Sequence, residues 1–365
     1  MSKELMVHVI TNFAGAGGVE MMLARLIKQT QHDYDHVIIS LMKTSEIYKD
    51  TLALCSSYYE LDWNWLNSVI VIWRLKKLLK KLKPKTVQCW MYGANFMTSF
   101  SQLNEKKRPD IFWGIHHSLN ALSEESIATR IGLVFNKLLS RQPTGIIYCA
   151  NSSLIQHQKI GLHNPNVYFI PNGVPLKNFN LNVDLHEPVV IGFAGRYHPA
   201  KGYPYLFEVI SKLKGYPVIF KIAGSGVNIK NPEIKAYFDK YLLDTNKVKL
   251  LDQISDMPAF YQSIDLFLMT SITEGFPNVL VEALASGLPC ISTDVGDAKY
   301  IIQDVGNIVR PRDPDALVNS ILQYLTLDTE EKKRLKQAAR CRAEKEFGIV
   351  KVSQQYIKVW QSVKK

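Results

Sequence analysis

The sequence predicts an α/β protein made of two doubly wound parallel sheets. Short apolar runs of strand length recur along the chain, and segments whose apolar residues follow helical spacing lie between them. This alternation is present in both halves, which are separated by a polar, irregular stretch around residues 176–188. A chain of 365 residues is long enough for two such domains. We therefore expect one domain over residues 1–180 and a second over residues 181–348.

Five strands are expected in the first half, with helical patterns between them, and residues 170–174 are expected to form a further strand end and turn. The first strand leads into a glycine-rich turn at residues 11–20, and a helical pattern follows from Met21. A glycine turn between a strand and a helix is a natural anion site. Its glycines do not complete the GxGxxG pattern, so a simple tight turn is the alternative. The predicted strands cover residues 5–10, 36–41, 86–90, 111–115 and 145–149.

The second half repeats the alternation and ends in three helical segments. Residues 314–317 belong to the helix after the last strand, and residues 330–346 are so strongly charged that we expect a solvated surface helix. Residues 349–363 form the last helical pattern. The predicted strands cover residues 189–194, 248–251, 266–269, 290–292 and 306–309, and a further strand ends within residues 221–226.

The stretch at residues 266–292 has the order strand, loop, helix, strand. We expect Pro277 at the first helical position and the end of the helix at Gly287. Glu274 lies in the loop and Glu282 in the second helical turn. A helix N-terminus suits a phosphate, whereas carboxylates beside it suit hydroxyls. A ligand with both groups, such as a sugar nucleotide, fits this pattern; the alternative is a helix-capping glutamate and a solvated one.

Cationic and imidazole side chains follow other predicted strands. Arg196 and Lys201 follow the first strand of the second half. The planar guanidinium of an arginine and the compact ammonium of a lysine together suit a diphosphate. A basic surface loop is the plainer interpretation. His116 and His117 follow the strand at residues 111–115, at the end where open α/β sheets bind ligands. A single histidine is more often structural, and a metal site is not expected because no third ligand is evident.

The composition, 47% hydrophobic and 21% charged, describes an ordinary soluble globular protein. No apolar run approaches the length of a membrane span, and the first residues do not resemble a signal peptide. The five cysteines include no CxxC pair, so we expect buried thiols at Cys89, Cys149 and Cys290 in the reducing cytoplasm. The net charge of +11 attracts phosphorylated ligands, anionic lipid or nucleic acid, without choosing among them.

Residues 63–85 combine an apolar side, which includes Trp63, Trp65 and Trp73, with a run of lysines and arginines. Basic amphipathic helices with tryptophans favour anionic membrane surfaces. The alternative interpretation of the same pattern is a surface helix that covers the sheet and whose lysines are simply solvated. The basic residues 106–108 could extend the patch.

Several of these segments resemble the retaining glycosyltransferases of family 4. The run from Glu274 to Asn278, followed by Glu282 and Ala283, is similar to the EGFP-type two-glutamate signature of that family. The resemblance covers nearly the whole chain. Further similar segments are GGVE at residues 17–20, GIHHS at 114–118, PNGV at 171–174, GRYHPAKG at 195–202 and AGSG at 223–226.

The resemblance implies the GT-B architecture, in which two Rossmann-like domains enclose a cleft and the last helix, residues 349–365, packs back on the first domain. It implies that Glu274 and His116 (with His117 as the second candidate) face the transferred sugar. It also implies that Glu282 holds the ribose hydroxyls. The other donor-binding residues that it implies are Arg196 and Lys201, which hold the phosphates, and Gly17, Gly18, Gly275, Phe276, Pro277, Asn278, Val279 and Leu280. With these cations present, neither a metal ion nor another cofactor is expected.

The implied function is transfer of a sugar, with retention, from a nucleotide-sugar donor that we expect to be UDP-linked. The implied acceptor is a glycan or a lipid-linked molecule in bacterial polysaccharide, lipopolysaccharide or capsule synthesis. We expect a cytoplasmic enzyme that can associate with the inner face of the membrane. The alternatives are a GT-B nucleotide-sugar epimerase or hydrolase and a non-catalytic membrane-surface binding protein. Nucleic acid is not an expected partner, because no motif with interleaved aromatics is present.

Overall fold

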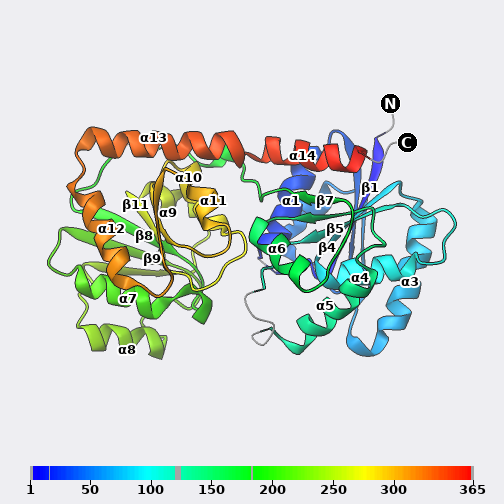
Figure 1. The fold of residues 1–365 in the computed structure, drawn as a ribbon, viewed down its shortest axis with the longest axis horizontal. Helices are drawn as coiled ribbons and strands as arrows, with labels where there is room; N and C mark the ends of the chain where they lie inside the picture. The colour runs from blue at the N-terminus through cyan, green and yellow to red at the C-terminus, as the bar shows by residue number, and fades with distance from the viewer. Residues whose placement is uncertain (1–2, 16, 120–124, 182–183, 363–365) are drawn as a thin grey trace. The chain divides into compact units, whose positions relative to one another are not determined.

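The chain forms two compact units, drawn in Figure 1. The first comprises residues 1–173 and 349–365, and the second comprises residues 174–348. The division lies before the expected boundary at residue 180, because Val174 already belongs to the second unit, where its N–H donates to the Phe347 carbonyl at 2.8 Å. The computed structural model describes residues 3–15, 17–119, 125–181 and 184–362, so residues 363–365 of the expected last helix lie outside the described residues.

The first unit contains, within its described residues, one sheet of seven parallel strands. Their order is β3-β2-β1-β4-β5-β6-β7, so the strand order reverses between β1 and β4. The five predicted strands are confirmed, and the strand end predicted at residue 170 corresponds to β7, which ends at Phe169. Only β3 was not predicted, because its apolar and polar residues do not form an apolar run. The bounds are β1 Glu4–Ile10, β2 Tyr34–Ser40, β3 Ser57–Glu60, β4 Thr86–Trp90, β5 Asp110–Ile115, β6 Gly145–Tyr148 and β7 Val167–Phe169.

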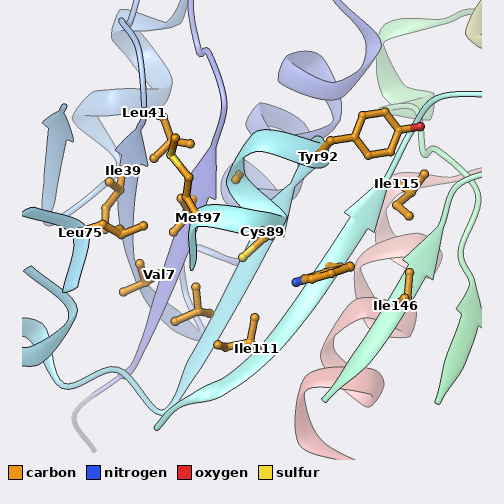
Figure 2. Packing of buried hydrophobic residues seen from close by; sticks show 14 of the residues in the cluster. Val7, Ile39, Leu41, Leu75, Cys89, Tyr92, Met97, Ile111, Ile115 and Ile146 are labelled. Carbon is orange, nitrogen blue, oxygen red and sulfur yellow. The ribbon is translucent and has the colours of Figure 1, made fainter. Parts of the chain in front are cut away.

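Helices cover both faces of this sheet. On one face, α3, α4 and α5 pack on the core shown in Figure 2, where Leu75 and Met97 meet Val7, Ile39 and Cys89 from the strands. On the other face, α1 and α14 form a second core with the same sheet. The helices are α1 Gly18–Thr30, α2 Lys49–Ala53, α3 Ser68–Leu82, α4 Met91–Ser101, α5 Ile127–Leu139, α6 Asn151–Lys159 and α14 Ile349–Gln361.

The second unit repeats the plan with six parallel strands in the order β10-β9-β8-β11-β12-β13, as far as its residues are described. The order reverses between β8 and β11. All six predicted strands are confirmed within one or two residues at their ends. The strands are β8 Val189–Ala194, β9 Val218–Ala223, β10 Val248–Asp252, β11 Leu266–Met269, β12 Cys290–Thr293 and β13 Gly306–Val309. The helices are α7 Tyr203–Lys212, α8 Pro232–Tyr241, α9 Met257–Gln262, α10 Asn278–Ala285, α11 Ala298–Ile302, α12 Pro314–Thr326 and α13 Thr329–Glu346.

The charged helix α13 is more than a solvated surface. It packs along α10, and Lys336 in its middle is fully buried. The Lys336 ammonium donates to the Asp184 carbonyl at 2.7 Å and lies 3.5 Å from the buried Asp265 carboxylate. Asp265 also accepts the Val190 N–H at 2.9 Å. A charged residue in a charged helix gives no sign that it is buried, so the sequence could not indicate this ion pair.

Buried histidines form an ordered hydrogen-bond chain in the first unit. Trp90 Nε1–H donates to His8 Nδ1 (3.4 Å), which places the His8 proton on Nε2. His8 Nε2–H then donates to His36 Nδ1 (3.0 Å), and His36 Nε2–H donates to the Thr30 hydroxyl (3.0 Å). The Thr30 hydroxyl in turn donates a hydrogen bond to the Leu26 carbonyl (2.8 Å). Each ring therefore has one donor and one acceptor nitrogen, an arrangement that only neutral histidines can make.

We predict that acid destabilises the first unit through these histidines. Burial lowers the pKa of His36 from 6.5 to about 4, and burial with the proximity of His36 lowers that of His8 well below 6.5. The unfolded chain then binds protons first, so their stabilisation is complete above about pH 6.5 and is lost as the pH falls toward 4. His36 alone should cost about 2 kcal/mol of unfolding free energy between pH 6.5 and 5.

Urea unfolding followed by tryptophan fluorescence measures this effect, because all six tryptophans lie in the first unit. A His36→Gln variant that folds should show a flatter pH dependence than the natural chain. An unfolding midpoint that is the same at pH 7.5 and pH 5 would contradict the assignment of neutral histidines.

Candidate functional site

The loops after two paired strands of the second unit contain the main predicted site residues. Residues 195–202 follow β8 and residues 270–277 follow β11, and these two strands are neighbours in the sheet. The strand order reverses between them, which is where open α/β sheets bind ligands. Arg196, Lys201 and Glu274 are thus presented at one edge of one sheet.

Lys201 and Glu274 form an ion pair across these loops. Lys201 Nζ lies 2.5 Å from Glu274 Oε1, and Ser271 Oγ donates to the same oxygen at 2.7 Å. Both charged side chains are mostly buried, so solvent screens the pair only weakly. Ser271 was not singled out from the sequence, because a serine three residues before a glutamate in a loop is an unremarkable pattern.

The loop after β8 is tied to the end of β11 by close backbone contact at Gly202. Gly202 has φ +68°, and a Cβ added there would lie 2.0 Å from the Thr270 carbonyl oxygen. The Thr270 hydroxyl donates to the Lys201 carbonyl at 3.0 Å. Only glycine satisfies both the left-handed backbone and this close approach. The contact fixes Lys201 beside the strand end that leads to Glu274.

Helix α10 begins and ends close to the predicted positions. Pro277 is the residue before the first helical turn, and Asn278 opens the helix, so Pro277 lies one position earlier than predicted. At the other end, the Gly287 N–H donates to the Leu284 carbonyl at 2.9 Å, and the Leu288 N–H donates to the Ala283 carbonyl at 3.0 Å. This is the Schellman arrangement, and it confirms the predicted end at Gly287. The positive end of the helix dipole follows directly after Glu274 and Gly275.

Glu282 is buried in the second turn of α10, whereas a capping or solvated role would expose it. Tyr261 from α9 donates its hydroxyl to Glu282 Oε2 at 3.3 Å and approaches the Val279 carbonyl at the same distance. The buried tyrosine therefore fixes the position of the carboxylate. Tyr261 was not singled out from the sequence, since an aromatic residue in an apolar helix predicts only packing.

The remaining predicted donor-binding residues around α10 differ in exposure. The side chains of Phe276, Pro277 and Leu280 are buried, and the Phe276 ring packs edge-on against Phe347. These residues can meet a ligand only through their backbone. Gly275, Asn278 and Val279 are partly exposed.

Arg196 is exposed and directly follows Gly195. The stem of Lys201 runs alongside this backbone, since a Cβ at Gly195 would lie 3.3 Å from Lys201 Cδ. Two cationic side chains therefore emerge from adjacent points of the same loop, as a diphosphate site requires.

Gly17 and Gly18 belong to the first unit. Gly17 precedes α1 and Gly18 is its first residue. The Glu20 carboxylate folds back over the turn, so that a Cβ at Gly17 would lie 2.5 Å from Glu20 Oε2. Partial burial raises the pKa of Glu20 above its usual value. Tyr48 supports the turn by donating its hydroxyl to the Gly15 carbonyl at 2.8 Å.

The two candidate histidines, also in the first unit, have different environments. Burial lowers the pKa of His116 to about 4, and the Asn172 side chain offsets this only in part, so His116 is neutral near pH 7. Its ring lies 5.3 Å from that of Trp90, centroid to centroid. His117 Nε2 lies 3.0 Å from a Glu125 carboxylate oxygen, and its side chain is exposed. His116 is thus a neutral imidazole whose two ring nitrogens are buried, and His117 lies within hydrogen-bonding distance of the Glu125 carboxylate.

Within the described ranges, no group of three or more His, Cys, Asp or Glu residues is placed to hold a metal ion. The two aspartates at residues 313 and 315 have structural partners: Asp313 caps α12 by accepting the Ala316 N–H at 2.9 Å, and Asp315 pairs with Lys212 at 2.5 Å.

Two family models match the chain. The model described as Glycosyltransferase Family 4 matches residues 16–178, and the model described as Glycosyl transferases group 1 matches residues 188–327. One match therefore lies largely in each structural unit.

Curated relatives are similar over part or all of the chain. A putative glycosyltransferase, EpsF of Bacillus subtilis, is 28% identical over 44% of this chain and 45% of its own length. An uncharacterised 41.2 kDa protein in the cps region of Klebsiella pneumoniae is 26% identical over 95% of this chain and 97% of its own. A capsular polysaccharide biosynthesis glycosyltransferase, CapM of Staphylococcus aureus, is 29% identical over 48% of this chain and 49% of its own. The chain thus matches about half the length of EpsF and CapM.

Solved structures share the whole fold. HepE of Anabaena in complex with UDP aligns with a TM-score of 0.83 and 18% identity, over 99% of this chain and 100% of that one. The lipopolysaccharide outer core galactosyltransferase WaaB aligns with a TM-score of 0.77 and 16% identity, over 98% of this chain and 99% of that one. At these identities the likeness concerns the fold alone, and it confirms the GT-B prediction.

We predict that Gly202→Ala strongly destabilises the second unit. The new Cβ would meet a backbone oxygen at 2.0 Å in a left-handed conformation, so neither strain nor clash can relax cheaply. The expected loss is at least about 2 kcal/mol of unfolding free energy. Calorimetry of the full chain measures it.

The matched control is Gly215→Ala, because a Cβ at Gly215 meets no atom within 4 Å. This variant should stay within about 0.5 kcal/mol of the natural chain. Equal stability of the two variants would show that the Gly202 contact does not hold the loop.

Proposed function

We propose that this chain, a glycosyltransferase of the GT-B type, is a retaining enzyme that uses a UDP-linked sugar donor. The proposed acceptor is a glycan or a lipid-linked molecule in bacterial polysaccharide, lipopolysaccharide or capsule synthesis. The observation that carries the proposal is the Lys201–Glu274 pair at the reversal point of the second sheet. It places a phosphate-binding cation and a hydroxyl-binding carboxylate side by side, as a sugar diphosphate needs.

The names of similar proteins support the choice of donor and acceptor. HepE was solved with UDP, with UDP-glucose, and with UDP and glucose. A relative from Escherichia coli, 26% identical over 42% of this chain, is a galactosyltransferase that uses UDP-Gal and a GlcNAc-diphosphoundecaprenol acceptor. We carry the UDP-linked donor and the lipid-linked acceptor over to this chain as parts of the proposal.

Charge on the departing diphosphate would be neutralised by Arg196, Lys201 and the N-terminus of α10. Glu274 pairs with Lys201, so donor binding would exchange one oxygen partner of the ammonium for another. These groups supply the positive charge that a metal ion supplies elsewhere, and the proposal therefore includes no metal. Glu282, held by Tyr261, would accept hydrogen bonds from the ribose hydroxyls.

In the proposed reaction, the bond from the anomeric carbon to the diphosphate oxygen breaks, and its electron pair leaves with the UDP. The acceptor oxygen attacks the same face of the sugar and passes its proton to the departing phosphate. Glu274 would stabilise positive charge on the sugar ring and orient its hydroxyls. His116, neutral because of its lowered pKa, would form a hydrogen bond with the sugar and would not repel the positive charge on the ring.

A nucleotide-sugar epimerase or hydrolase is the second candidate, because the same donor contacts would serve it. The products separate the two: transfer needs an acceptor and yields a glycoside of unchanged anomeric configuration, whereas hydrolysis yields a free sugar. Nuclear magnetic resonance of the anomeric proton distinguishes these outcomes.

We predict different effects for the two glutamates. Glu282→Ala should weaken donor binding at least about 10-fold, because it removes hydrogen bonds from a charged acceptor to the ribose. Glu274→Ala should lower turnover about 100-fold or more. It should leave donor binding unchanged or tighter, since Lys201 is then free to contact phosphate. Calorimetric titration with the donor and steady-state kinetics measure the two effects.

Glu330→Ala is the control, because Glu330 is an exposed residue in the first turn of α13. It should behave as the natural chain does. Wild-type binding and turnover in both the Glu274 and Glu282 variants would refute the site.

We also predict that UDP and a UDP-sugar protect the second unit against heat. At 100 times its dissociation constant, a ligand adds about 2.7 kcal/mol, which corresponds to about 5–10 °C for a unit of this size. A panel of UDP-, GDP-, ADP- and CMP-linked sugars measures the choice of base by calorimetry. Protection by another base instead of uracil would correct the donor, and no protection by any of them would contradict a nucleotide site.

A further inference from the structure

Helix α3 has two faces of different chemistry. The face toward the sheet buries Val71, Leu75 and Leu79. The opposite face is exposed and changes character along its length, from apolar side chains at its N-terminal end to cationic ones at its C-terminal end. Those apolar side chains are Val69, Ile70 and Trp73, preceded by Leu66 in the turn before the helix, and the cationic ones are Lys77, Lys80 and Lys81.

The turn that leads into α3 presents its apolar side chains without unsatisfied backbone. Leu66 is 99% exposed at its tip, beside the exposed indole of Trp65. The Asn64 side chain accepts the Leu66 and Asn67 N–H groups at 3.0 and 3.2 Å, and the Asn67 side chain accepts the Asn64 N–H at 2.9 Å. Asn67 also donates to the Asp62 carbonyl at 2.9 Å. A segment whose hydrogen bonds are made internally can leave water at little cost.

Helix α5 adds a second exposed apolar stripe. Leu133 joins the core beneath the sheet and Asn136 donates to the Tyr92 carbonyl of α4 at 2.9 Å, whereas Ile127, Val134 and Leu138 are exposed. Helix α4 packs against both α3 and α5, and all three cover the same face of the sheet (Figure 1). The exposed side chains of α3 and α5 therefore lie on the same side of the sheet. Such an extended exposed apolar surface is not expected of a unit with no partner.

We propose that the outer faces of α3 and α5 dock the first unit on an anionic lipid bilayer. The positive charge on α3 favours an anionic bilayer over a second copy of the chain as the binding partner. Two copies of the chain that met through this face would bring the same lysines together, whereas lipid phosphates and anionic headgroups neutralise them. Trp65 and Trp73 supply the amphipathic rings that prefer the headgroup boundary, and Lys77 lies 3.6 Å from the Trp73 ring centroid. No helix among the described residues is long and apolar enough to cross a membrane, so this surface lies on the bilayer.

The gradient along α3 fixes the orientation of the helix. The N-terminal turn with Leu66 enters the acyl boundary, about 5–10 Å below the headgroups. The C-terminal lysines remain at the level of the phosphates. The inference goes beyond the proposed sugar transfer and rests on this surface alone.

Vesicle binding of the full chain tests the docking. Vesicles of phosphatidylcholine with 30% phosphatidylglycerol, chosen as the probe, should bind the chain, pure phosphatidylcholine vesicles should bind it weakly, and added salt should reduce the difference. Lys80→Gln with Lys81→Gln should weaken binding about 25-fold, since each lysine near an anionic surface contributes about fivefold. The matched control is Lys230→Gln with Lys249→Gln, which removes two exposed lysines of the second unit and should leave binding unchanged.

A second pair of variants tests the apolar side chains of the proposed docking surface. Leu66→Glu should abolish binding to the anionic vesicles, whereas Leu242→Glu, at an 82% exposed leucine of the second unit, should not. Both positions are exposed, so neither variant should affect folding, and circular dichroism checks this. Leu138→Glu on α5 should weaken binding as Leu66→Glu does.

Three outcomes would overturn the docking: equal binding to neutral and anionic vesicles, unchanged binding of Leu66→Glu, or loss of a dimer in light scattering of Leu66→Glu. The last would show that a second copy covers the surface. Thermal protection of the same preparation by UDP-sugar reports on the proposed function separately, because no variant in this series touches Lys201, Glu274 or Glu282.

Discussion

The candidate site depends on the ion pair between Lys201 and Glu274. Each residue lies in a loop whose direction is set by the strand before it, and the two strands are neighbours because the strand order reverses at that point. The close contact at Gly202 and the hydrogen bond from Ser271 hold the two loops together. An ammonium and a carboxylate in a mostly buried place would each be costly alone, so their pairing keeps both charges available until a ligand replaces one partner.

Much of the fold could be predicted from the sequence, because parallel strands buried on both faces appear as apolar runs. The strands of the second unit were all predicted, and so was the end of α10 at Gly287. Prediction failed for β3, whose residues alternate between partly buried and exposed, and for β7 only the end was predicted, because a strand of three residues is too short to give a pattern of its own. The exposed stripe of α5 was also missed, because apolar residues at helical spacing do not reveal which side faces water.

The site was predictable only where side chains carry charge in a recognisable order. The glutamates and the Arg196–Lys201 loop were named from the sequence, whereas Ser271 and Tyr261, which hold the glutamates, were not. Burial explains the other differences between the environments expected from the sequence and those in the structure. Phe276 and Leu280 lie in the core, Lys336 is buried in a helix that looked solvated, and His116 is neutral because water is excluded from it. Pairing and burial are tertiary properties, which local sequence patterns cannot report.

The division of the chain has a consequence for its synthesis. The first unit is discontinuous, since α14 supplies Val352, Tyr356 and Trp360 to the core under α1, and the Trp360 indole donates to Gln88 at 3.0 Å. A ribosome therefore releases the whole second unit before the last helix of the first emerges. The second unit can therefore fold while one face of the first unit's sheet is covered by α1 alone, and a chaperone could bind the apolar residues that α14 later buries.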